Sequence, residues 1–518
     1  MNEMDRNSGV EQFDVEAVNK SEQRHQPLYA ARKKVHPKRT KGTFRSLKWL
    51  IMAVTLAIYY VTPWLRWDRG PFAPDQAVLV DLENRRFYFF FIEIWPQEFY
   101  YIAGLLVMAG IGLFFVTSTV GRAWCGYTCP QTVWVDLFLV VERFFEGDRN
   151  ARIKLDNASW SFDKLRKRAA KHIFWLLISV GTGGAWVFYF ADAPELLLDM
   201  LSLSAEPIAY STVAVLTATT YIFGGHMREQ VCTYMCPWPR VQGAMLDEHS
   251  LVVTYNDWRG EPRRPHKRKG HDAETSFGDC VDCNACVAVC PMGIDIRDGQ
   301  QFECITCALC IDACDAVMDK VGKDRGLISY TTFNNYNTNM SLVALADGGI
   351  DATKARDPET GKLNSSFVNQ GLRAAFRLRT FLYLALWSAI GLAMLIALFA
   401  RGTVDVSVLH DRAPLYVQMS DGSIRNGYMV KVANKRSDAR TFTLRTEGLP
   451  GALLRAAGNT DDPTNELTLN VGADRLGAVK VYVWANPEDE RLDFDFVITD
   501  ATGEITVREA TTFEGPEK

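Results

Sequence analysis

The apolar residues of this chain gather into long runs separated by polar stretches, a pattern typical of helices that cross a membrane. Five runs carry no Lys, Arg, Asp or Glu: Trp49–Leu65, Phe99–Thr117, His172–Phe190, Ile208–Gly224 and Phe381–Ala400. A helix needs about 20 apolar residues to cross the hydrocarbon core of a bilayer. We therefore expect five membrane spans, and for any single run the alternative is a buried helix of a soluble domain.

Two further apolar segments, Phe87–Trp95 and Leu196–Leu203, are too short to span and contain an acidic residue each. We expect both to lie at the membrane interface or to pack against the helix bundle.

Beyond Arg401 the pattern changes to short segments that alternate in polarity or are rich in β-branched residues. D-G, N-G, P-G and N-P pairs, which favour turns, occur among them. The segments are Val404–Leu409, Leu415–Met419, Tyr428–Asn434, Thr441–Thr446, Glu466–Val471, Val479–Ala485 and Asp493–Thr499. About seven short strands predict an immunoglobulin-like β-sandwich over residues 401–518.

Charge is nearly balanced in number but uneven in position. The 57 Lys and Arg and 61 Asp and Glu give a net charge of -4, which does not indicate a nucleic-acid partner. Lys and Arg concentrate before the first run, between the second and third runs, and in the segment Arg263–Lys269, whereas the segment between the third and fourth runs is acidic. Basic flanks stay in the cytoplasm. The positions predict a multi-pass protein of the bacterial inner membrane, with its N-terminal tail and cysteine-rich region inside and its C-terminal domain in the periplasm. Arg66, Arg69, Arg85 and Arg86 in the first outward loop run against the rule.

Eight of the 12 cysteines form a tandem C-x₂-C-x₂-C-x₃-C repeat, the spacing of bacterial ferredoxins that bind two 4Fe–4S clusters. In that arrangement three cysteines wrap one cluster and the fourth begins a helix that crosses to the other. The expected sets are Cys280, Cys283 and Cys286 with Cys314, and Cys304, Cys307 and Cys310 with Cys290. Zinc ribbons or a disulfide framework are the alternative, but zinc sites usually pair C-x₂-C units across a longer insert. Pro291 follows the fourth cysteine of the first half, whereas Asp315 stands there in the second half, so the second turn is expected to differ.

The remaining four cysteines form a second internal repeat, C-x-Y-x-C-P, after the second and fourth apolar runs. Its members are Cys125 and Cys129 in the first copy and Cys232 and Cys236 in the second. If the two helical hairpins pack side by side, both pairs meet at the cytoplasmic face. Thiolates are soft ligands that suit Cu(I), zinc or iron–sulfur centres, and four buried structural cysteines are the alternative.

Two histidines lie near these motifs. His226 is a candidate ligand for a soft metal beside the second pair, and ordinary packing explains it equally well. His172 is a candidate haem or metal ligand, with an interfacial histidine as the simpler interpretation.

Together these features predict a multi-domain membrane protein: an α-helical transmembrane bundle of about five spans, a bacterial ferredoxin-like module and an immunoglobulin-like β-sandwich. Residues 1–43 are polar and become basic, and we expect them to form a disordered tail. The further boundaries expected are 44–240 for a four-span membrane domain with both C-x-Y-x-C-P motifs, 241–330 for a dicluster ferredoxin domain, 331–380 for a polar cytoplasmic linker, 381–400 for the fifth transmembrane helix and 401–518 for the periplasmic domain.

The combination of paired C-x-Y-x-C-P motifs, a double cluster motif, a further span and a β-sandwich resembles the FixG/CcoG-type cytochrome c oxidase accessory proteins. The resemblance extends over nearly all of the chain beyond the N-terminal tail. It implies cluster binding by the eight ferredoxin cysteines and copper chemistry at Cys125, Cys129, Cys232 and Cys236, where Cu(II) is reduced to Cu(I). It also implies a role in assembling the cbb-type haem–copper oxidase. The partners expected are a copper chaperone or transporter, oxidase assembly factors and a cytoplasmic electron donor that the sequence does not identify.

Two other functions share part of this pattern. A membrane subunit that oxidises quinol, similar to the NapH type, would have the same spans and clusters but needs a quinone pocket. A non-enzymatic assembly scaffold would keep the sandwich without requiring redox-active clusters. Purified protein assayed separately with copper and with quinol analogues would distinguish these functions.

Overall fold

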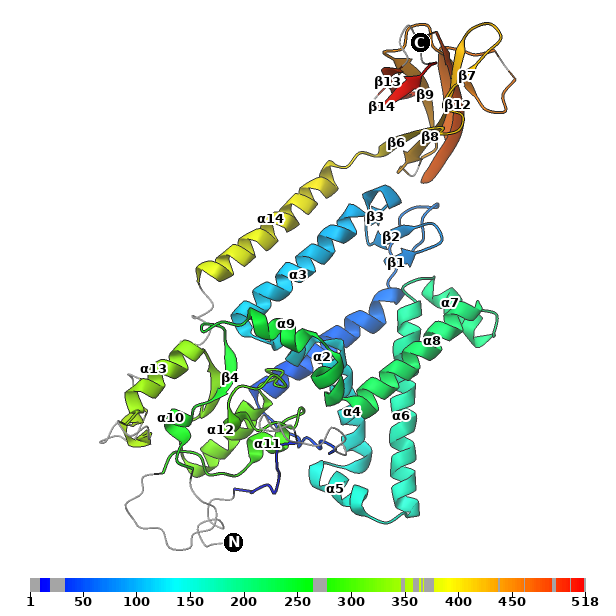
Figure 1. Cartoon of the computed structure of the whole chain (residues 1–518). Helices are drawn as coiled ribbons and strands as arrows, with labels where there is room; N and C mark the ends of the chain where they lie inside the picture. The colour runs from blue at the N-terminus through cyan, green and yellow to red at the C-terminus, as the bar shows by residue number, and fades with distance from the viewer. Residues whose placement is uncertain are drawn as a thin grey trace. The chain divides into compact units, whose positions relative to one another are not determined.

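The computed structural model describes most of the 518-residue chain (Figure 1). The described residues are 10–18, 33–263, 277–345, 350–356, 363–364, 367, 377–436, 438–460, 462–486, 491–503 and 505–516. The basic run Arg263–Lys269 lies outside them after its first residue. The chain divides into two compact units, one of Met1–Leu65 with Gln76–Ala393 and one of Arg66–Asp75 with Met394–Lys518.

Within the described residues, four helical segments are long and apolar enough to cross a membrane: Thr43–Trp64, Pro96–Val120, Pro207–Met227 and Leu378–Ala400. They correspond to the first, second, fourth and fifth apolar runs and indicate a membrane protein. The elements that form them are α2 (Thr43–Val61) with η1 (Thr62–Trp64), η2 (Pro96–Glu98) with α3 (Tyr100–Val120), α8 (Pro207–Thr220) with η4 (Tyr221–Met227), and α14 (Leu378–Ala400).

The third apolar run lies in α6 (Phe162–Val187), a helix of 26 residues that is not among these four. It is long enough to span, since 26 residues rise about 39 Å, but its glycines, Thr182 and Lys171 make it less apolar. Gly183 lets α8 approach, because a Cβ there would lie 2.9 Å from the Val213 carbonyl oxygen. A fifth span therefore remains a prediction.

Small residues also bring α3 and α14 together. The Trp387 indole N–H donates to the Met108 carbonyl at 3.1 Å. A Cβ on Gly112 would lie 3.2 Å from the same indole nitrogen, and one on Gly391 would lie 3.0 Å from Met108 Cε. Close approach through glycines is a common way for membrane helices to pack.

The two short apolar segments adopt different structures. Phe87–Trp95 contributes to an antiparallel sheet of order β1-β2-β3, and the Leu196–Leu203 segment falls largely in α7, whose Leu196 and Leu197 pack against Val187 and Phe188. The bounds are β1 (Val78–Asp81), β2 (Arg86–Phe89), β3 (Ile92–Ile94) and α7 (Ala193–Leu201), with α4 (Pro130–Glu146) and α5 (Arg149–Asn157) between α3 and α6.

The ferredoxin-like module, residues 252–343, is built around a buried core that includes Val287, Ile296, Ile311, Met318 and Leu327. Strands β4 and β5 pair in antiparallel fashion at its edge. Its elements are β4 (Val252–Tyr255), α10 (Asp257–Gly260), α11 (Ala285–Val289), η6 (Ile296–Asp298), α12 (Leu309–Val321), β5 (Ile328–Thr331) and α13 (Phe333–Val343), and η7 (Ala352–Ala355) follows.

Part of the N-terminal segment is ordered against this module, in contrast to the expectation of a disordered tail. The Phe13 side chain is 6% exposed, and its backbone N–H donates to the Cys283 carbonyl at 3.0 Å. The Lys38 N–H donates to the Ala288 carbonyl at 2.8 Å. These backbone contacts depend little on side-chain type, which explains why a polar sequence did not predict them.

The second unit contains the β-sandwich. One sheet has the order β10-β12-β8-β6 with β7 paired to β8, and the other has the order β11-β9-β13-β14. Tyr428, Phe442, Phe496 and Phe513 fill the space between them, each 0–1% exposed. All seven predicted strands are present, and β10 and β14 are two that the pattern did not predict. The bounds are β6 (Val404–His410), β7 (Val417–Gln418), β8 (Ile424–Asn434), β9 (Arg440–Glu447), β10 (Leu453–Ala456), β11 (Glu466–Val471), β12 (Arg475–Ala485), β13 (Arg491–Asp500) and β14 (Thr506–Glu514).

Candidate functional site

Cysteines from the two halves of the ferredoxin repeat lie near one another, as the expected ligand sets require, and the sets themselves stay a prediction. Burial raises the thiol pKa of Cys314 well above its usual value, and Cys286, Cys283 and Cys280 are the charged neighbours that raise it further. For Cys310, burial is again the main cause of the raised pKa, followed by Cys307, Cys304 and Cys290. Cys314 therefore lies near cysteines of the first half, and Cys290 lies near Cys307 and Cys304 of the second half.

The backbone has the same conformation around the second cysteine of each half. Asp282 and Asn284, on either side of Cys283, have φ of 48° and 57°, and Thr306 and Ala308, on either side of Cys307, have φ of 55° and 58°. Non-glycine residues rarely adopt this left-handed backbone conformation. Its occurrence on both sides of Cys283 and of Cys307 indicates that the two loops have the same tight curvature.

The residues present around the second loop fit an iron–sulfur cluster. One cavity has an apolar wall that includes Ile305, and five cysteines line it: Cys286, Cys290, Cys304, Cys307 and Cys310. Four thiolates facing a dry cavity are the donor set of a 4Fe–4S cluster. Resident clusters would supply one-electron transfer, and the protein would keep water away from them.

The crossing helices differ from expectation in where they begin. Each begins just before the third cysteine of its half, not at the fourth: α11 begins at Ala285 and α12 at Leu309. Helix α11 ends before Cys290 and Pro291, whereas α12 continues through Cys314 to Val321. Asp315 is the reason for the difference, since it allows the helix to continue where proline would interrupt it. Its Oδ1 accepts from the Gly326 N–H at 2.9 Å.

The two C-x-Y-x-C-P motifs share one local structure. Each begins in a widened π-helical turn, η3 (Trp124–Thr128) and η5 (Val231–Met235). The turns close with bonds from the Cys129 N–H to the Trp124 carbonyl at 2.9 Å and from the Cys236 N–H to the Val231 carbonyl at 2.8 Å. Helices α4 and α9 (Trp238–Met245) follow directly. Such turns occur frequently at functional sites.

These motifs bring the four thiols together. Burial raises the pKa of Cys125 to about 12, with Cys129 as the next cause and Cys236 among the others. Burial likewise raises the pKa of Cys232 to about 12, followed by the effects of Cys129, Cys125 and Cys236. The Cys125 thiol donates to Oε1 of Gln242 at 3.0 Å. Both half-buried thiols are protonated at neutral pH, so a metal that binds them must displace their protons.

The four thiols are not arranged around one ion. Within the described residues, no three His, Cys, Asp or Glu side chains are placed to hold a single metal ion. His226 lies instead against His172 and Tyr221, with ring centroids 5.8 Å and 5.3 Å away. The structure thus groups His226 with the other candidate histidine.

The first motif packs directly on a cluster-binding loop. A Cβ on Gly126 would lie 2.7 Å from the Ile305 carbonyl oxygen and 3.1 Å from Cys307 Cα. The Tyr127 hydroxyl donates to the Cys307 carbonyl at 3.2 Å. Tyr127 is buried here, whereas Tyr234 of the second motif is 71% exposed.

Arg122 joins the first motif, the second motif and the ferredoxin-like module. Its guanidinium donates to the carbonyls of Phe302 and Cys304, and to the carbonyl of Pro239 just after the second motif. No local sequence signal identifies this residue, because all its acceptors are backbone groups distant in the chain.

A carboxylate of the ferredoxin-like module caps the first membrane helix. Asp312 of α12 accepts from the backbone N–H groups of Phe44 at 3.2 Å and Arg45 at 2.7 Å, at the start of α2. Arg45 in turn pairs with Asp136 of α4 at 2.9 Å. A carboxylate at a helix N-terminus interacts favourably with the helix dipole. The cluster module, the first span and α4 are therefore joined by buried polar contacts.

The apolar helices, the two cysteine-lined loops and the adjoining thiols define a membrane iron–sulfur electron-transfer protein. Three family models match the chain: a 4Fe–4S dicluster domain over residues 227–333, a 4Fe–4S binding domain over residues 102–146, and the IG-like fold at the C-terminal of FixG over residues 394–516.

Relatives match along most of the chain. It is 61% identical to the nitrogen fixation protein FixG of Rhizobium meliloti (strain 1021), over 92% of this chain and 90% of that protein. It is 53% identical to protein RdxB of Cereibacter sphaeroides, over 94% of this chain and 97% of that protein. A crystal structure of a FixG-related protein from Vibrio parahaemolyticus matches 22% of this chain and 97% of that chain, at 21% identity and a TM-score of 0.19. The chain belongs to the FixG family.

Proposed function

We propose that this protein is a membrane-bound cupric reductase that supplies Cu(I) for assembly of a cbb-type cytochrome c oxidase. The observation that carries the proposal is the contact between the first thiol motif and the Ile305–Cys307 loop. Gly126 of the motif makes this contact, and its lack of a side chain lets the two backbones approach. A copper ion that reaches Cys125 or Cys129, on either side of Gly126, is then next to a cluster-binding loop. Copper is the substrate: each Cu(II) takes up one electron and becomes Cu(I), which thiolates bind well.

The direction of electron flow is part of this proposal. A cytoplasmic reductant donates the electrons, the ferredoxin-like module lies on the cytoplasmic side, and the β-sandwich lies in the periplasm. A copper chaperone or transporter and oxidase assembly factors then receive Cu(I). The uneven distribution of Lys and Arg supports this orientation.

Replacing Cys125, Cys129, Cys232 and Cys236 with Ala tests the role of the thiols. We expect copper reduction by the purified, chemically reduced protein to be lost while the cluster absorbance stays unchanged. A matched control is Met235→Ala, since Met235 lies inside the second motif but is 52% exposed. Copper reduction that persists in the four-cysteine variant would refute the assignment.

A second role for the four thiols has its own support. The 4Fe–4S binding domain model over residues 102–146 includes Cys125 and Cys129, which supports iron as an alternative metal at these thiols. Two clusters contribute about eight iron atoms per chain and a third would raise the count to about twelve. Iron and sulfide analysis of the wild type and the four-cysteine variant separates the two roles: equal counts support a copper site, and a loss of about four iron atoms supports a third cluster.

A further inference from the structure

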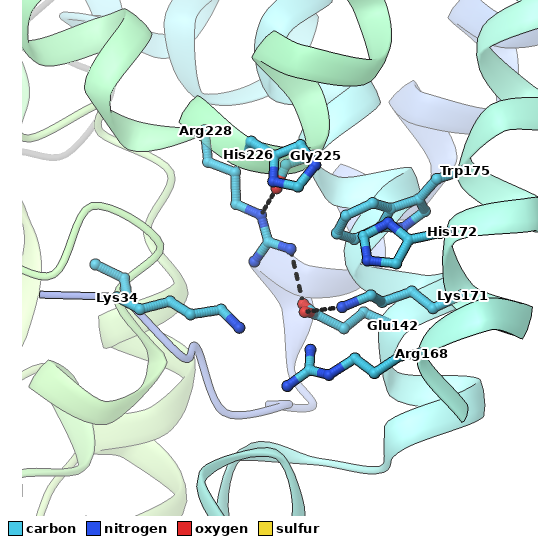
Figure 2. Close-up of a pocket in the computed structure, with 10 residues that line it drawn as sticks. Lys34, Glu142, Arg168, Lys171, His172, Trp175, Gly225, His226 and Arg228 are labelled. Atoms are coloured by element: carbon cyan, nitrogen blue, oxygen red, sulfur yellow. Dashed lines mark hydrogen bonds and ion pairs between the residues drawn. The ribbon is translucent and has the colours of Figure 1, made fainter. Parts of the chain in front are cut away.

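A cavity of about 260 Å³ lies where α4, α6 and η4 meet the N-terminal segment (Figure 2). Four cationic side chains line it and their charged ends point toward the same space, whereas Glu142 is the one carboxylate in the lining. The cations are Lys34, Arg168, Lys171 and Arg228. The cavity is separate from the cysteine sites, and the proposed copper reduction does not use it.

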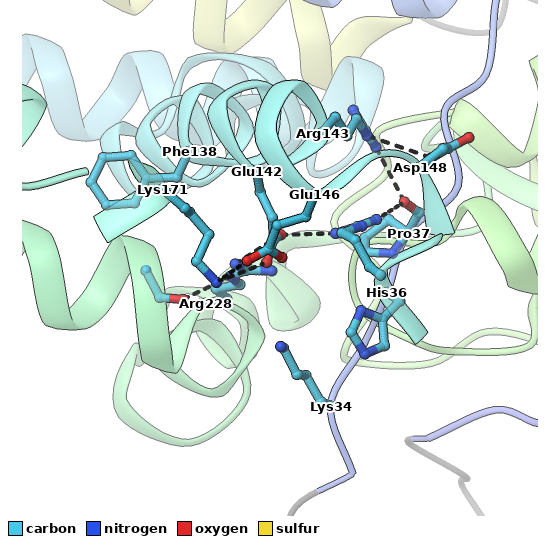
Figure 3. Close-up of polar contacts among 12 residues, drawn as sticks. Lys34, His36, Pro37, Phe138, Glu142, Arg143, Glu146, Asp148, Lys171 and Arg228 are labelled. Atoms are coloured by element: carbon cyan, nitrogen blue, oxygen red, sulfur yellow. Dashed lines mark hydrogen bonds and ion pairs between the residues drawn. The ribbon is translucent and has the colours of Figure 1, made fainter. Parts of the chain in front are cut away.

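Two carboxylates, Glu142 and Glu146, lie near Lys171 and Arg228 (Figure 3), but the carboxylates of this region do not balance its cations. Glu142 is fully buried and is shared by Arg152 at 2.8 Å, Arg228 at 3.0 Å and Lys171 at 3.8 Å. Burial would raise the pKa of Glu142, but Arg228, Arg152 and Lys171 lower it to about 2, so the group is ionised. Glu146 and Asp156 pair with Arg168. With Arg152 added to the four cations of the lining, five positive charges face three carboxylates. The carboxylates are Glu142, Glu146 and Asp156, so two positive charges are in excess.

Arg228 has unused hydrogen-bonding capacity. Its side chain is 7% exposed; Nε donates to the Gly225 carbonyl at 2.8 Å and Nη2 contacts Glu142. Nη1 is buried and has no hydrogen-bond partner in the described structure. The residue also has φ of 41°, a backbone conformation that costs free energy in a non-glycine residue. A buried guanidinium donor without an acceptor is unfavourable, so a bound acceptor would stabilise it.

From this geometry we infer that the cavity binds the phosphate group of an anionic ligand, supplied by a phospholipid headgroup or by a free phosphate compound. A guanidinium fork matches phosphate oxygens, and lysine ammonium groups add point charges around them. The cavity volume suits a phosphate with its nearest substituents. The excess of positive charge also disfavours a copper ion at His226, which lines the same cavity.

Arg228 connects this cavity to the thiol region. It also lines a second, smaller cavity together with Cys232, Pro291 and Ile305. A phosphate bound by Arg228 would therefore lie next to the smaller cavity, whose wall contains Cys232 and Ile305 of the cluster-binding loop. Phosphate binding is expected to hold this wall in place.

The test uses the full-length, delipidated protein in detergent with two probes, inorganic phosphate followed by calorimetry and a short-chain phosphatidylglycerol followed by native mass spectrometry. Lys34→Gln removes a cation at the mouth of the cavity, where its ammonium group contacts only Asp156 at 3.1 Å among the ion pairs described. Lys154→Gln is the matched control, since Lys154 is an exposed lysine on α5 that does not line the cavity.

We expect at least one probe to bind, and Lys34→Gln to weaken it about tenfold, as for loss of a charge-assisted hydrogen bond, while Lys154→Gln leaves affinity unchanged. Phosphatidylglycerol retained over phosphatidylcholine identifies a lipid headgroup as the source, and binding of inorganic phosphate without lipid preference identifies a soluble one. Failure of both probes to bind the wild-type protein, or equal effects of the two substitutions, would overturn the inference. Unchanged iron content in each variant verifies that the fold is intact.

Discussion

Replacing Gly126 with Ala tests whether close contact between the thiol motif and the cluster loop matters. The new Cβ would lie 2.7 Å from the Ile305 carbonyl oxygen, whereas ordinary contact begins at 3.4 Å, so the two backbones must separate by about 0.7 Å. The Ile305 carbonyl oxygen belongs to the backbone, so it cannot rotate out of the way as the end of a side chain could. Overpacking of this kind costs about 1–3 kcal/mol.

The assay combines chemical denaturation with copper reduction and iron content. Gly110→Ala is the matched control, because a Cβ at Gly110 of α3 meets nothing within 4 Å. We expect Gly126→Ala to lower both the unfolding free energy and the rate of copper reduction while retaining its iron, and Gly110→Ala to change neither by much. If Gly126→Ala behaved like Gly110→Ala, the contact would not be tight and our explanation of electron transfer would lose its basis.

Three further predictions concern buried polar groups. Asp136→Asn should lower the unfolding free energy by about 3–5 kcal/mol in denaturant titration, because it leaves the buried Arg45 guanidinium without its ion pair. Glu142 has its folded pKa lowered to about 2, so its stabilising effect is present above about pH 4.5 and is lost as the pH falls toward 2; unfolding free energies at several pH values should fall by about 3 kcal/mol over this range, and Glu142→Gln should flatten the slope. Tyr428→Phe should cost about 1 kcal/mol by denaturant titration, since its hydroxyl donates to the Thr512 carbonyl at 2.7 Å inside the sandwich.

The ligand sets of the two clusters stay a prediction from the sequence, which rests on the few ways that closely spaced ligands in a short loop can surround a cluster. The start of each crossing helix was less predictable. It depends on the left-handed residues Asn284 and Ala308, which directly precede α11 and α12. Ala308 in particular gives no sequence signal for this conformation, because alanine favours the right-handed helix.

Strand β14 shows a different limit. Its sequence is largely polar, and only Phe513 is fully buried, since the strand lies at the edge of its sheet. An edge strand with one half-buried face lacks the alternation that revealed its neighbours. Helix α6 was predicted correctly as a helix. It is less apolar than the four candidate membrane spans, so its role as a fifth span stays a prediction.

The contacts that join the site were the least predictable. Arg122 and Asp312 act on backbone groups from distant parts of the chain. Their roles depend on tertiary structure alone. The cationic cavity was missed for the same reason: Lys34, Arg168 and Arg228 are far apart in sequence, and charged residues near a membrane are most simply explained as facing solvent or lipid headgroups.

The most direct test of the central claim is a single-turnover measurement with an electron count. The clusters are reduced anaerobically, excess reductant is removed, and Cu(II) is added while cluster absorbance and Cu(I) formation are followed together. We predict that cluster reoxidation and Cu(I) formation keep pace at about one Cu(I) per cluster, and that both slow strongly when Cys125, Cys129, Cys232 and Cys236 are replaced with Ala. Clusters that stay reduced after Cu(II) is added, or equally fast copper reduction in the four-cysteine variant, would contradict the claim.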